Sequence, residues 1–264
     1  MKTASKIAPV LKNVTIEVTD RCNLNCSYCF NNSSIKGARE LSLGEIKRIA
    51  EIGTLRGASS FLLTGGEITL VPHAAEALRH IVGLGAEVNM LSNGTNIKSI
   101  DRETISSLRR VQISLDSADK GVHDSKRGKG SHDAALKAID YARSCDAPVE
   151  ISITVSSDRM GEMEGVAKIA YETGSKVLVR LLQAIGRASG QADGNITDKI
   201  ARQRKGLLPK FGDIFVEDFA MYVPVLGKDH DRIATERGYL TVLPDGAVRG
   251  TGINLLQIGA EQRI

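Results

Sequence analysis

The sequence predicts an α/β fold in which six βα units curl into a partial, TIM-like (β/α)6 barrel with a short C-terminal hairpin extension. Short strand-like runs alternate with amphipathic helical runs, which is the pattern of parallel strands linked by helices. Six such units fit the chain, so the barrel is expected to be open rather than closed by eight units. Several strand runs also alternate apolar and polar residues, whereas strands buried on both faces are almost continuously apolar.

Six strand runs carry this fold. The first, residues 14–20, leads directly into a loop with three cysteines, and the others are expected at residues 60–64, 87–93, 111–116, 149–155 and 176–183. Ser42 and Glu45 form a capping box ahead of apolar residues at helical spacing. Pro72 suits the first turn of the next helix. Later helices are expected near residues 100–108, 133–143 and 159–173.

The regular pattern fades after residue 185. Residues 186–210 are rich in Gly, Arg and Lys and predict a mobile connection. Residues 238–248 predict a hairpin that turns at Pro244, Asp245 and Gly246. We therefore expect two domains, a partial barrel over residues 1–185 and an extension over residues 186–264.

The alternation within the strands predicts a polar barrel interior. In the first strand Val14 and Ile16 alternate with Thr15 and Glu17. If the apolar side chains face the helices, the polar ones point into a solvent-filled lumen that can hold a charged cofactor and a substrate. A half-exposed antiparallel sheet is the alternative, which the intervening helices disfavour. The side chains expected in the lumen are those of Glu17, Asn89, Gln112, Ser152, Thr154 and Arg180, of which Glu17, Gln112, Thr154 and Arg180 are candidate substrate contacts.

The composition narrows the classes of partner. A net charge of +4 fits an anionic cofactor or substrate but is too small to indicate nucleic acid, and aromatic residues make up only 4% with no Trp to stack on bases. No apolar run approaches the ~20 residues that span a bilayer, and residues 1–12 do not resemble a signal peptide, so a cytoplasmic protein without a membrane partner is expected. A solvated basic face, rather than a nucleic-acid site, is expected for Lys199, Arg202, Arg204, Lys205 and Lys210.

The central motif is a C-x3-C-x2-C spacing formed by Cys22, Cys26 and Cys29 after the first strand. Three thiolates so close together can ligate three irons of a four-iron cluster and leave the fourth iron open to a chelating ligand. Structural zinc and inert thiols are the alternatives. Zinc needs a fourth ligand, and the nearest further candidate is His73. Cys145, the remaining cysteine, is expected to serve packing.

The cysteine loop, with Tyr28 before the last cysteine, resembles the defining motif of the radical S-adenosylmethionine (radical SAM) superfamily. This resemblance implies one [4Fe–4S] cluster on the three cysteines and S-adenosylmethionine as the cofactor, with Tyr28 beside its adenine. Gly65, Gly66 and Glu67 look like the family's Gly-Gly-Glu motif, which receives the amino group of the cofactor. Ile68 stands where that motif usually has proline.

Further residues resemble the branch of the superfamily that includes peptide-modifying maturases. Ser92 and Asn93 end the third strand run, and Ser114 and Asp116, with Arg127 after them, carry the resemblance to that branch. It implies that Ser114 and Arg127 bind the cofactor carboxylate; a solvated loop charge is the alternative for Arg127. Gly186, Arg187 and Ala188 also match this branch, and the resemblance covers residues 14–258. The full set of expected cofactor contacts is Tyr28, Gly65, Gly66, Glu67, Ser92, Asn93, Ser114, Asp116 and Arg127.

The chain departs from this branch at its C-terminal extension. Members usually carry a cysteine-rich SPASM or twitch region with auxiliary clusters, and residues 238–248 resemble its hairpin. The expected cysteines are absent, and Arg249 and Gly250 stand where one would fall. A degenerate SPASM/twitch-like extension without auxiliary clusters favours redox-neutral chemistry over net oxidation of the substrate.

The resemblance implies an enzyme that reductively cleaves S-adenosylmethionine to a 5′-deoxyadenosyl radical and abstracts hydrogen from a ribosomally made peptide. The alternative is the same chemistry on a small polar metabolite such as a sugar, cyclitol or nucleoside. A non-catalytic iron–sulfur protein is the alternative of another class. A protein that only binds a cluster needs no cofactor pocket, whereas the resemblance implies such a pocket at Gly65, Gly66, Glu67 and Arg127. The implied partner is an electron donor such as flavodoxin or ferredoxin.

Overall fold

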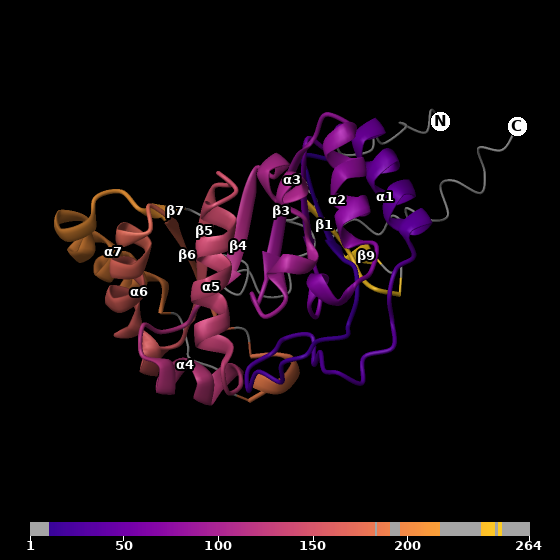
Figure 1. Ribbon diagram of the computed structural model, residues 1–264. Coiled ribbons are helices and arrows are strands. Elements are labelled where there is room, and N and C mark those ends of the chain that lie inside the picture. The colour runs from indigo at the N-terminus through magenta and orange to yellow at the C-terminus, as the bar shows by residue number, and fades with distance from the viewer. Residues whose placement is uncertain (1–10, 183, 191–195, 217–238, 246–247, 250–264) are drawn as a thin grey trace, which may run out of the picture.

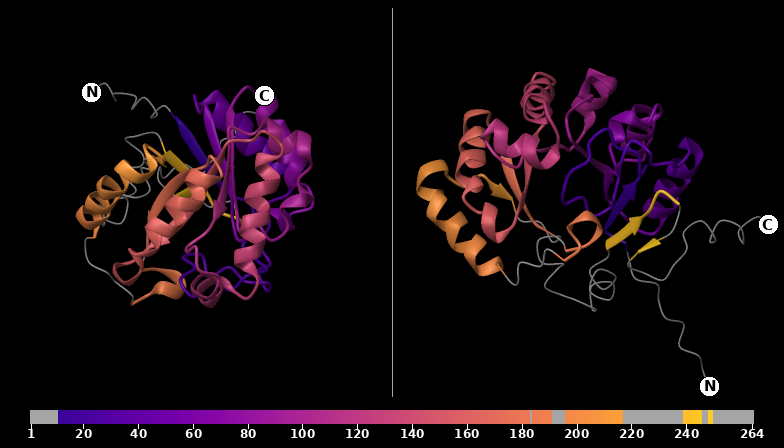
Figure 2. Two further views of the ribbon diagram at one scale, coloured as in Figure 1. Left: turned by 60° about the vertical axis from the view of Figure 1, so that its left-hand side comes forward. Right: turned by 90° about the horizontal axis from the view of Figure 1, so that it is seen from below.

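The computed structural model describes residues 11–182, 184–190, 196–216, 239–245 and 248–249, and its strands form one curved sheet. The six expected strands are present as β1 (Asn13–Glu17), β2 (Ser60–Thr64), β3 (Glu87–Ser92), β4 (Arg110–Ser114), β5 (Val149–Val155) and β6 (Lys176–Leu181). They are parallel neighbours in chain order. Helices form an arc along one side of the curved sheet (Figures 1 and 2). The predicted partial α/β barrel is confirmed.

The helices that connect these strands lie where the sequence places them. They are α1 (Leu43–Leu55), α2 (Ala74–Gly83), α3 (Arg102–Ser107), α5 (Ser131–Arg143) and α6 (Glu162–Glu172). The capping box of α1 is present, because Glu45 N–H donates to Ser42 Oγ at 3.3 Å and Ser42 N–H donates to Glu45 Oε2 at 2.7 Å. Pro72 lies just before α2 rather than inside its first turn.

Two helices were not expected. The short helix α4 (Lys120–Arg127) begins at Asp119, whose side chain accepts a hydrogen bond from Val122 N–H. Helix α7 (Thr197–Phe211) replaces most of the predicted mobile connection. Ile200 and Leu207 are the residues that α7 buries, so its apolar stripe is too narrow to stand out among basic residues. Lys199, Arg202 and Lys205 are exposed as expected, and Lys210 is exposed and paired with Glu164. Arg204 departs from the expectation, because it is half-buried with its Cζ atom 5.5 Å from the centre of the Phe215 ring.

The C-terminal residues extend the same sheet at both ends. Strand β7 (Phe215–Val216) pairs with β6, and β8 (Tyr239–Val242) pairs in parallel with β1. Strand β9 (Val248–Arg249) is antiparallel to β8, so the expected hairpin is present. The division between residues 185 and 186 into two domains stays a prediction. Among the described residues no helix has the length and apolar character needed to cross a bilayer.

The two faces of the sheet differ as the alternation predicts. Apolar strand residues such as Ile16, Ile113 and Ile151 are fully buried in one core together with the inner faces of the helices. On the other face Arg180 Nε donates to Ser152 Oγ at 3.1 Å, and an Arg180 Nη donates to Gln112 Oε1 at 3.2 Å. The polar side chains of three neighbouring strands therefore share one face, away from the helices.

Candidate active site at the carboxyl edge of the sheet

The three cysteines lie on the loop that leaves the carboxyl end of β1. Cys22 N–H donates to Ser34 O at 2.9 Å, and Cys29 N–H donates to Cys26 O at 3.2 Å, so backbone bonds shape the loop at both ends. The thiols of Cys22, Cys26 and Cys29 are free. Parallel barrels build their sites at this edge because the carboxyl ends of all strands meet there.

The donor set suits a cluster better than a single ion. Among the described residues no three His, Cys, Asp or Glu side chains converge on one point, and this holds for the three thiols as well. The preference for a cluster therefore rests on the types of donor: three thiolates can bind three irons of one cubane, whereas structural zinc needs a fourth ligand. Burial raises the pKa of Cys22 to about 11 and also raises the pKa of Cys26. Ligation would therefore release protons from these thiols.

The segment after β6 clamps the cysteine loop. Arg187 Nε donates to Cys26 O at 2.6 Å and its Nη2 donates to Ser33 O at 2.9 Å, while Arg187 N–H donates to Cys29 O at 2.9 Å. Gly186 has φ +61°, and a Cβ there would lie 2.3 Å from Phe30 O. In the sequence, Gly186 and Arg187 stood out only because they match the maturase branch. Their contact with the cysteine loop could not be predicted, because no pattern of neighbouring residues indicates it.

The Gly-Gly turn after β2 packs against the backbone that enters the loop. Gly65 has φ +146°, and a Cβ would lie 2.5 Å from Thr19 O; at Gly66 it would lie 2.3 Å from Arg21 O. Gly66 N–H and Glu67 N–H donate to those same carbonyls. Both glycines are needed for this close approach.

Glu67 joins the ends of β2 and β3. Its carboxylate is buried, with Oε1 accepting from the Thr69 backbone and hydroxyl and from Ser92 Oγ at 2.7 Å. Oε2 accepts from Asn93 N–H at 2.7 Å. Each carboxylate oxygen offers about two acceptor positions, and Oε2 accepts one hydrogen bond from the described residues, so its second position is the one left for a cationic ammonium. Asn93 Nδ2 also lies 3.8 Å from the sulfur of Cys22, which ties the expected contacts Glu67, Ser92 and Asn93 to the cysteine loop.

A buried ion pair follows β4. Arg127 Nε and Nη2 donate to the two oxygens of Asp116 at 2.7 and 3.2 Å, and Thr154 N–H donates to Asp116 at 3.0 Å. The Tyr28 hydroxyl donates to the same carboxylate. Burial alone would raise the pKa of Asp116, but the charge of Arg127 and these hydrogen bonds outweigh it and hold the pKa below its usual value. The structure therefore excludes a solvated loop charge for Arg127.

Tyr28 lies under two guanidinium groups. The Cζ atoms of Arg159 and Arg127 are 4.8 and 5.5 Å from the centre of its ring. Arg159 was not predicted as a site residue from the sequence, because its position after β5 indicates only the start of a helix. Its side chain is buried, its Nε donates to Ser156 Oγ at 2.9 Å, and its Nη1 has no partner among the described residues.

The candidate substrate contacts line the polar face of the sheet. Gln112 Nε2 donates to Glu150 Oε2 at 2.9 Å, and with Arg180 these residues form one network. Thr154 reaches the site through its backbone contact with Asp116, and Glu17 accepts from Asn31 Nδ2 at 2.8 Å. Two further residues were expected at the site or in the lumen. Ser114 is buried at the carboxyl end of β4. Asn89 Nδ2 donates to Ser60 Oγ near the amino ends of the strands.

Residues 16–164, more than half of the chain, match the Radical SAM superfamily, and the chain belongs to this family. Its members are enzymes that use a [4Fe–4S] cluster and S-adenosylmethionine. The three cysteines, the Gly-Gly turn and Glu67 all lie within the matched residues.

Similarity to individual proteins is spread over enzymes with different substrates. The chain is 28% identical to the antilisterial bacteriocin subtilosin biosynthesis protein AlbA of Bacillus subtilis over 91% of this chain and 55% of that protein. It is 33% identical to a probable GTP 3',8-cyclase of Pyrococcus abyssi over 54% of this chain and 47% of that protein. The chain thus spans about half the length of these curated relatives.

A solved structure has the same fold. Streptococcus suis SuiB bound to precursor peptide SuiA superposes with a TM-score of 0.77 at 12% identity, over 96% of this chain and 66% of that one. At this level of identity the comparison supports the architecture of the curved parallel sheet and its helices, and it leaves the substrate open.

Proposed function

We propose that this protein is a radical SAM enzyme that modifies a ribosomally made peptide. When bound, the cluster and S-adenosylmethionine supply a 5′-deoxyadenosyl radical, which removes a hydrogen atom from the substrate. The observation that carries the proposal is that the cysteine loop contacts Asn93, which donates to Glu67, and also contacts the Asp116–Arg127 pair, at one edge of the sheet. A peptide substrate is favoured because similarity to AlbA extends over 91% of this chain.

Each group at the site has a defined task in this proposal. Cys22, Cys26 and Cys29 hold the cluster, and Oε2 of Glu67 accepts the ammonium of the cofactor. The position of Glu67 is set by its neighbours Gly65, Gly66, Ser92 and Asn93.

On the other side, Asp116 holds Arg127 and Tyr28 in place. Ser114 and Arg127 are assigned to the cofactor carboxylate. The polar face with Gln112, Arg180, Thr154 and Glu17 orients polar groups of the substrate.

A small polar metabolite, such as a nucleoside, is the second candidate substrate. Two observations favour it: the 33% identity to a probable GTP 3',8-cyclase, and the charged network on the lumen face of β4, β5 and β6. In either case residues 1–185 would form the catalytic barrel and residues 186–264 a SPASM/twitch-like extension. A reduced flavodoxin or ferredoxin would supply the electron.

Release of 5′-deoxyadenosine after anaerobic reconstitution and reduction with dithionite tests the proposal. Wild-type protein is expected to bind about four irons per chain and to release 5′-deoxyadenosine. The triple variant Cys22→Ala, Cys26→Ala, Cys29→Ala should lose both, while Cys145→Ala, which removes a cysteine buried in the helical core, should keep both. An iron cluster that persists in the triple variant would contradict the assignment.

Deuterium transfer separates the two substrate classes. A candidate peptide and a nucleoside, each deuterated at its carbon-bound positions, are supplied in parallel to the reduced enzyme. Deuterium is expected in 5′-deoxyadenosine from the peptide only. Transfer from the nucleoside alone would establish the metabolite alternative.

A further inference from the structure

A positively charged guanidinium is fixed directly on the backbone of the cysteine loop. Arg187 lies in the short turn Gly186–Ala188, which follows β6 and lies beside the loop (Figure 1). Its Nε donates to Cys26 O at 2.6 Å, and its Nη2 donates to Ser33 O at 2.9 Å. Both acceptors are neutral carbonyls, so these contacts hold the charge of the side chain in place without cancelling it.

Two other arginines at the loop are paired with carboxylates. Arg21 lies 3.1 Å from Glu40, and Arg127 lies 2.7 Å from Asp116. Arg187 differs from both, because it is half-buried and forms no ion pair within the part of the chain that the structure describes. Its positive charge is therefore the one that acts on the cysteine loop without a compensating negative charge beside it.

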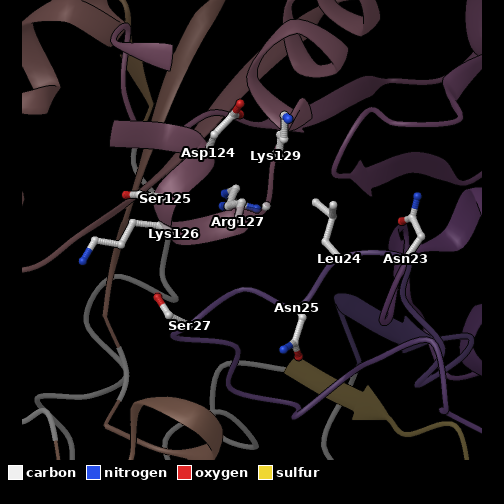
Figure 3. A pocket seen from close by; sticks show the side chains of 10 residues that line it. Asn23, Leu24, Asn25, Ser27, Asp124, Ser125, Lys126, Arg127 and Lys129 are labelled. Atoms are coloured by element: carbon white, nitrogen blue, oxygen red, sulfur yellow. The ribbon is translucent and has the colours of Figure 1, made fainter. Parts of the chain in front are cut away.

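Arg187 also lies apart from the expected cofactor contacts. Figure 3 shows Arg127, which is assigned to the cofactor carboxylate, in the wall of a cavity of about 300 Å³ between the cysteine loop and the end of α4. Arg187 does not line this cavity. Arg159 also has no ion pair with a described residue, but it contacts the ring of Tyr28 rather than the backbone of a cysteine. Between these two unpaired arginines, Arg187 is the one that contacts a cluster-ligand residue.

We propose that Arg187 raises the reduction potential of the cluster that this loop holds. The inference rests on the proposed function, in which the oxidised cluster takes one electron from a low-potential donor and the donor loses that electron. The added electron makes the cluster more negative, so a fixed positive charge nearby stabilises the reduced state more than the oxidised state. The potential therefore rises, and a weaker reductant can reduce the cluster.

Arginine suits this task because its charge does not depend on pH. A guanidinium stays protonated in proteins, whereas the charge of a lysine is lost more readily when the residue is buried. The half-buried position of Arg187 also limits screening by water and salt. Its planar fork holds Cys26 O and Ser33 O together, so the charge keeps a fixed place on the loop.

Two substitutions separate the charge of Arg187 from its hydrogen bonds. Arg187→Gln removes the charge and keeps an N–H donor for one carbonyl, whereas Arg187→Lys keeps the charge and loses the planar fork. Arg202→Gln, on the exposed face of α7, changes the net charge of the protein equally and is the control. Each protein is reconstituted anaerobically and titrated with dithionite and redox mediators in the absence of S-adenosylmethionine. EPR spectroscopy measures the fraction of reduced cluster at each potential.

A second pair of variants leaves the hydrogen bonds of Arg187 intact. Ser189→Asp places a carboxylate at an exposed position two residues after Arg187, and Ser189→Asn is its neutral counterpart. This pair replaces Arg187→Gln if that variant does not retain its cluster. The added carboxylate opposes the charge of Arg187, so Ser189→Asp should have a lower midpoint potential than Ser189→Asn.

Arg187→Gln should make the one-electron reduction roughly tenfold less favourable, which corresponds to a midpoint potential about 59 mV below that of wild type. Arg187→Lys and Arg202→Gln should keep the wild-type potential. Equal potentials for wild type and Arg187→Gln would overturn the proposal. An equal drop in Arg187→Gln and Arg187→Lys would also overturn it, because the shape of the loop rather than the charge would then set the potential.

Failure of the proposed function would give a different result. A wild-type cluster that is reduced but releases no 5′-deoxyadenosine from S-adenosylmethionine would overturn the proposed function. The difference in midpoint potential between wild type and Arg187→Gln would still stand in that case, because it is measured without the cofactor.

Discussion

Replacement of Arg187 by alanine tests whether the segment after β6 holds the cysteine loop in shape. The change removes the two side-chain hydrogen bonds to Cys26 O and Ser33 O, at 2.6 and 2.9 Å, and leaves the backbone bond from Arg187 N–H to Cys29 O. The loop would then keep one hydrogen bond to the segment after β6, together with its attachment to β1. We therefore expect looser retention of the cluster rather than loss of the fold.

The magnitude follows from the two lost bonds. Hydrogen bonds to a charged group contribute about 1.5–3 kcal/mol each, and the half-buried carbonyls regain part of that from water, so about 2 kcal/mol is expected in total. This corresponds to a roughly thirtyfold increase in the equilibrium for local opening of the loop. Arg187→Lys should fall between wild type and alanine, because an ammonium cannot bridge two carbonyls as a planar guanidinium does.

The assay is the rate at which a chelator removes iron from the reconstituted protein. Arg187→Ala should release iron about thirtyfold faster than wild type if release follows local opening. Arg202→Ala, on the exposed face of α7, removes an arginine of the same charge and should release iron at the wild-type rate. Equal rates for wild type and Arg187→Ala would refute the clamp.

Three further changes probe other contacts of the site. Ser114→Ala should weaken S-adenosylmethionine binding about tenfold in calorimetry and leave the melting temperature unchanged. Arg127→Ala leaves the buried Asp116 unpaired, so it should lower the free energy of unfolding in urea by about 3–5 kcal/mol. An unchanged free energy of unfolding would contradict the buried pair. Gly66→Ala places a Cβ 2.3 Å from a backbone oxygen and should lower the melting temperature, and a wild-type value would refute that close approach. Burial alone would raise the pKa of Asp124, but backbone N–H donors lower it to about 2, so its carboxylate contributes stability above about pH 4 that is lost as the pH falls through about 2. Urea unfolding of Asp124→Asn should therefore match wild type near pH 2 and fall below it at pH 7; a constant difference across this range would exclude that contribution.

The sequence was most informative where the chemistry is local. The spacing of Cys22, Cys26 and Cys29 and the Gly-Gly turn lie within short segments, so their residue types alone indicate a cluster and a close backbone approach. The strands were predicted because alternation repeats every two residues and is independent of distant contacts. Helix α7 was missed since two buried residues, Ile200 and Leu207, give too weak a period among charged neighbours.

The tertiary structure decided how these segments are joined. Tyr28 and Asp116 are 88 residues apart, and Arg187 and Cys26 are 161 apart, yet each pair is hydrogen-bonded. No local pattern encodes such pairs, because they depend on the order of parallel strands, which brings the carboxyl ends of β1, β4, β5 and β6 to one edge. The sequence by itself determined which groups can hold iron and the cofactor. The sheet determined that Arg127 is held by Asp116, that Arg187 secures the loop, and that the loop meets the end of α4, since these contacts exist only once the strands have aligned.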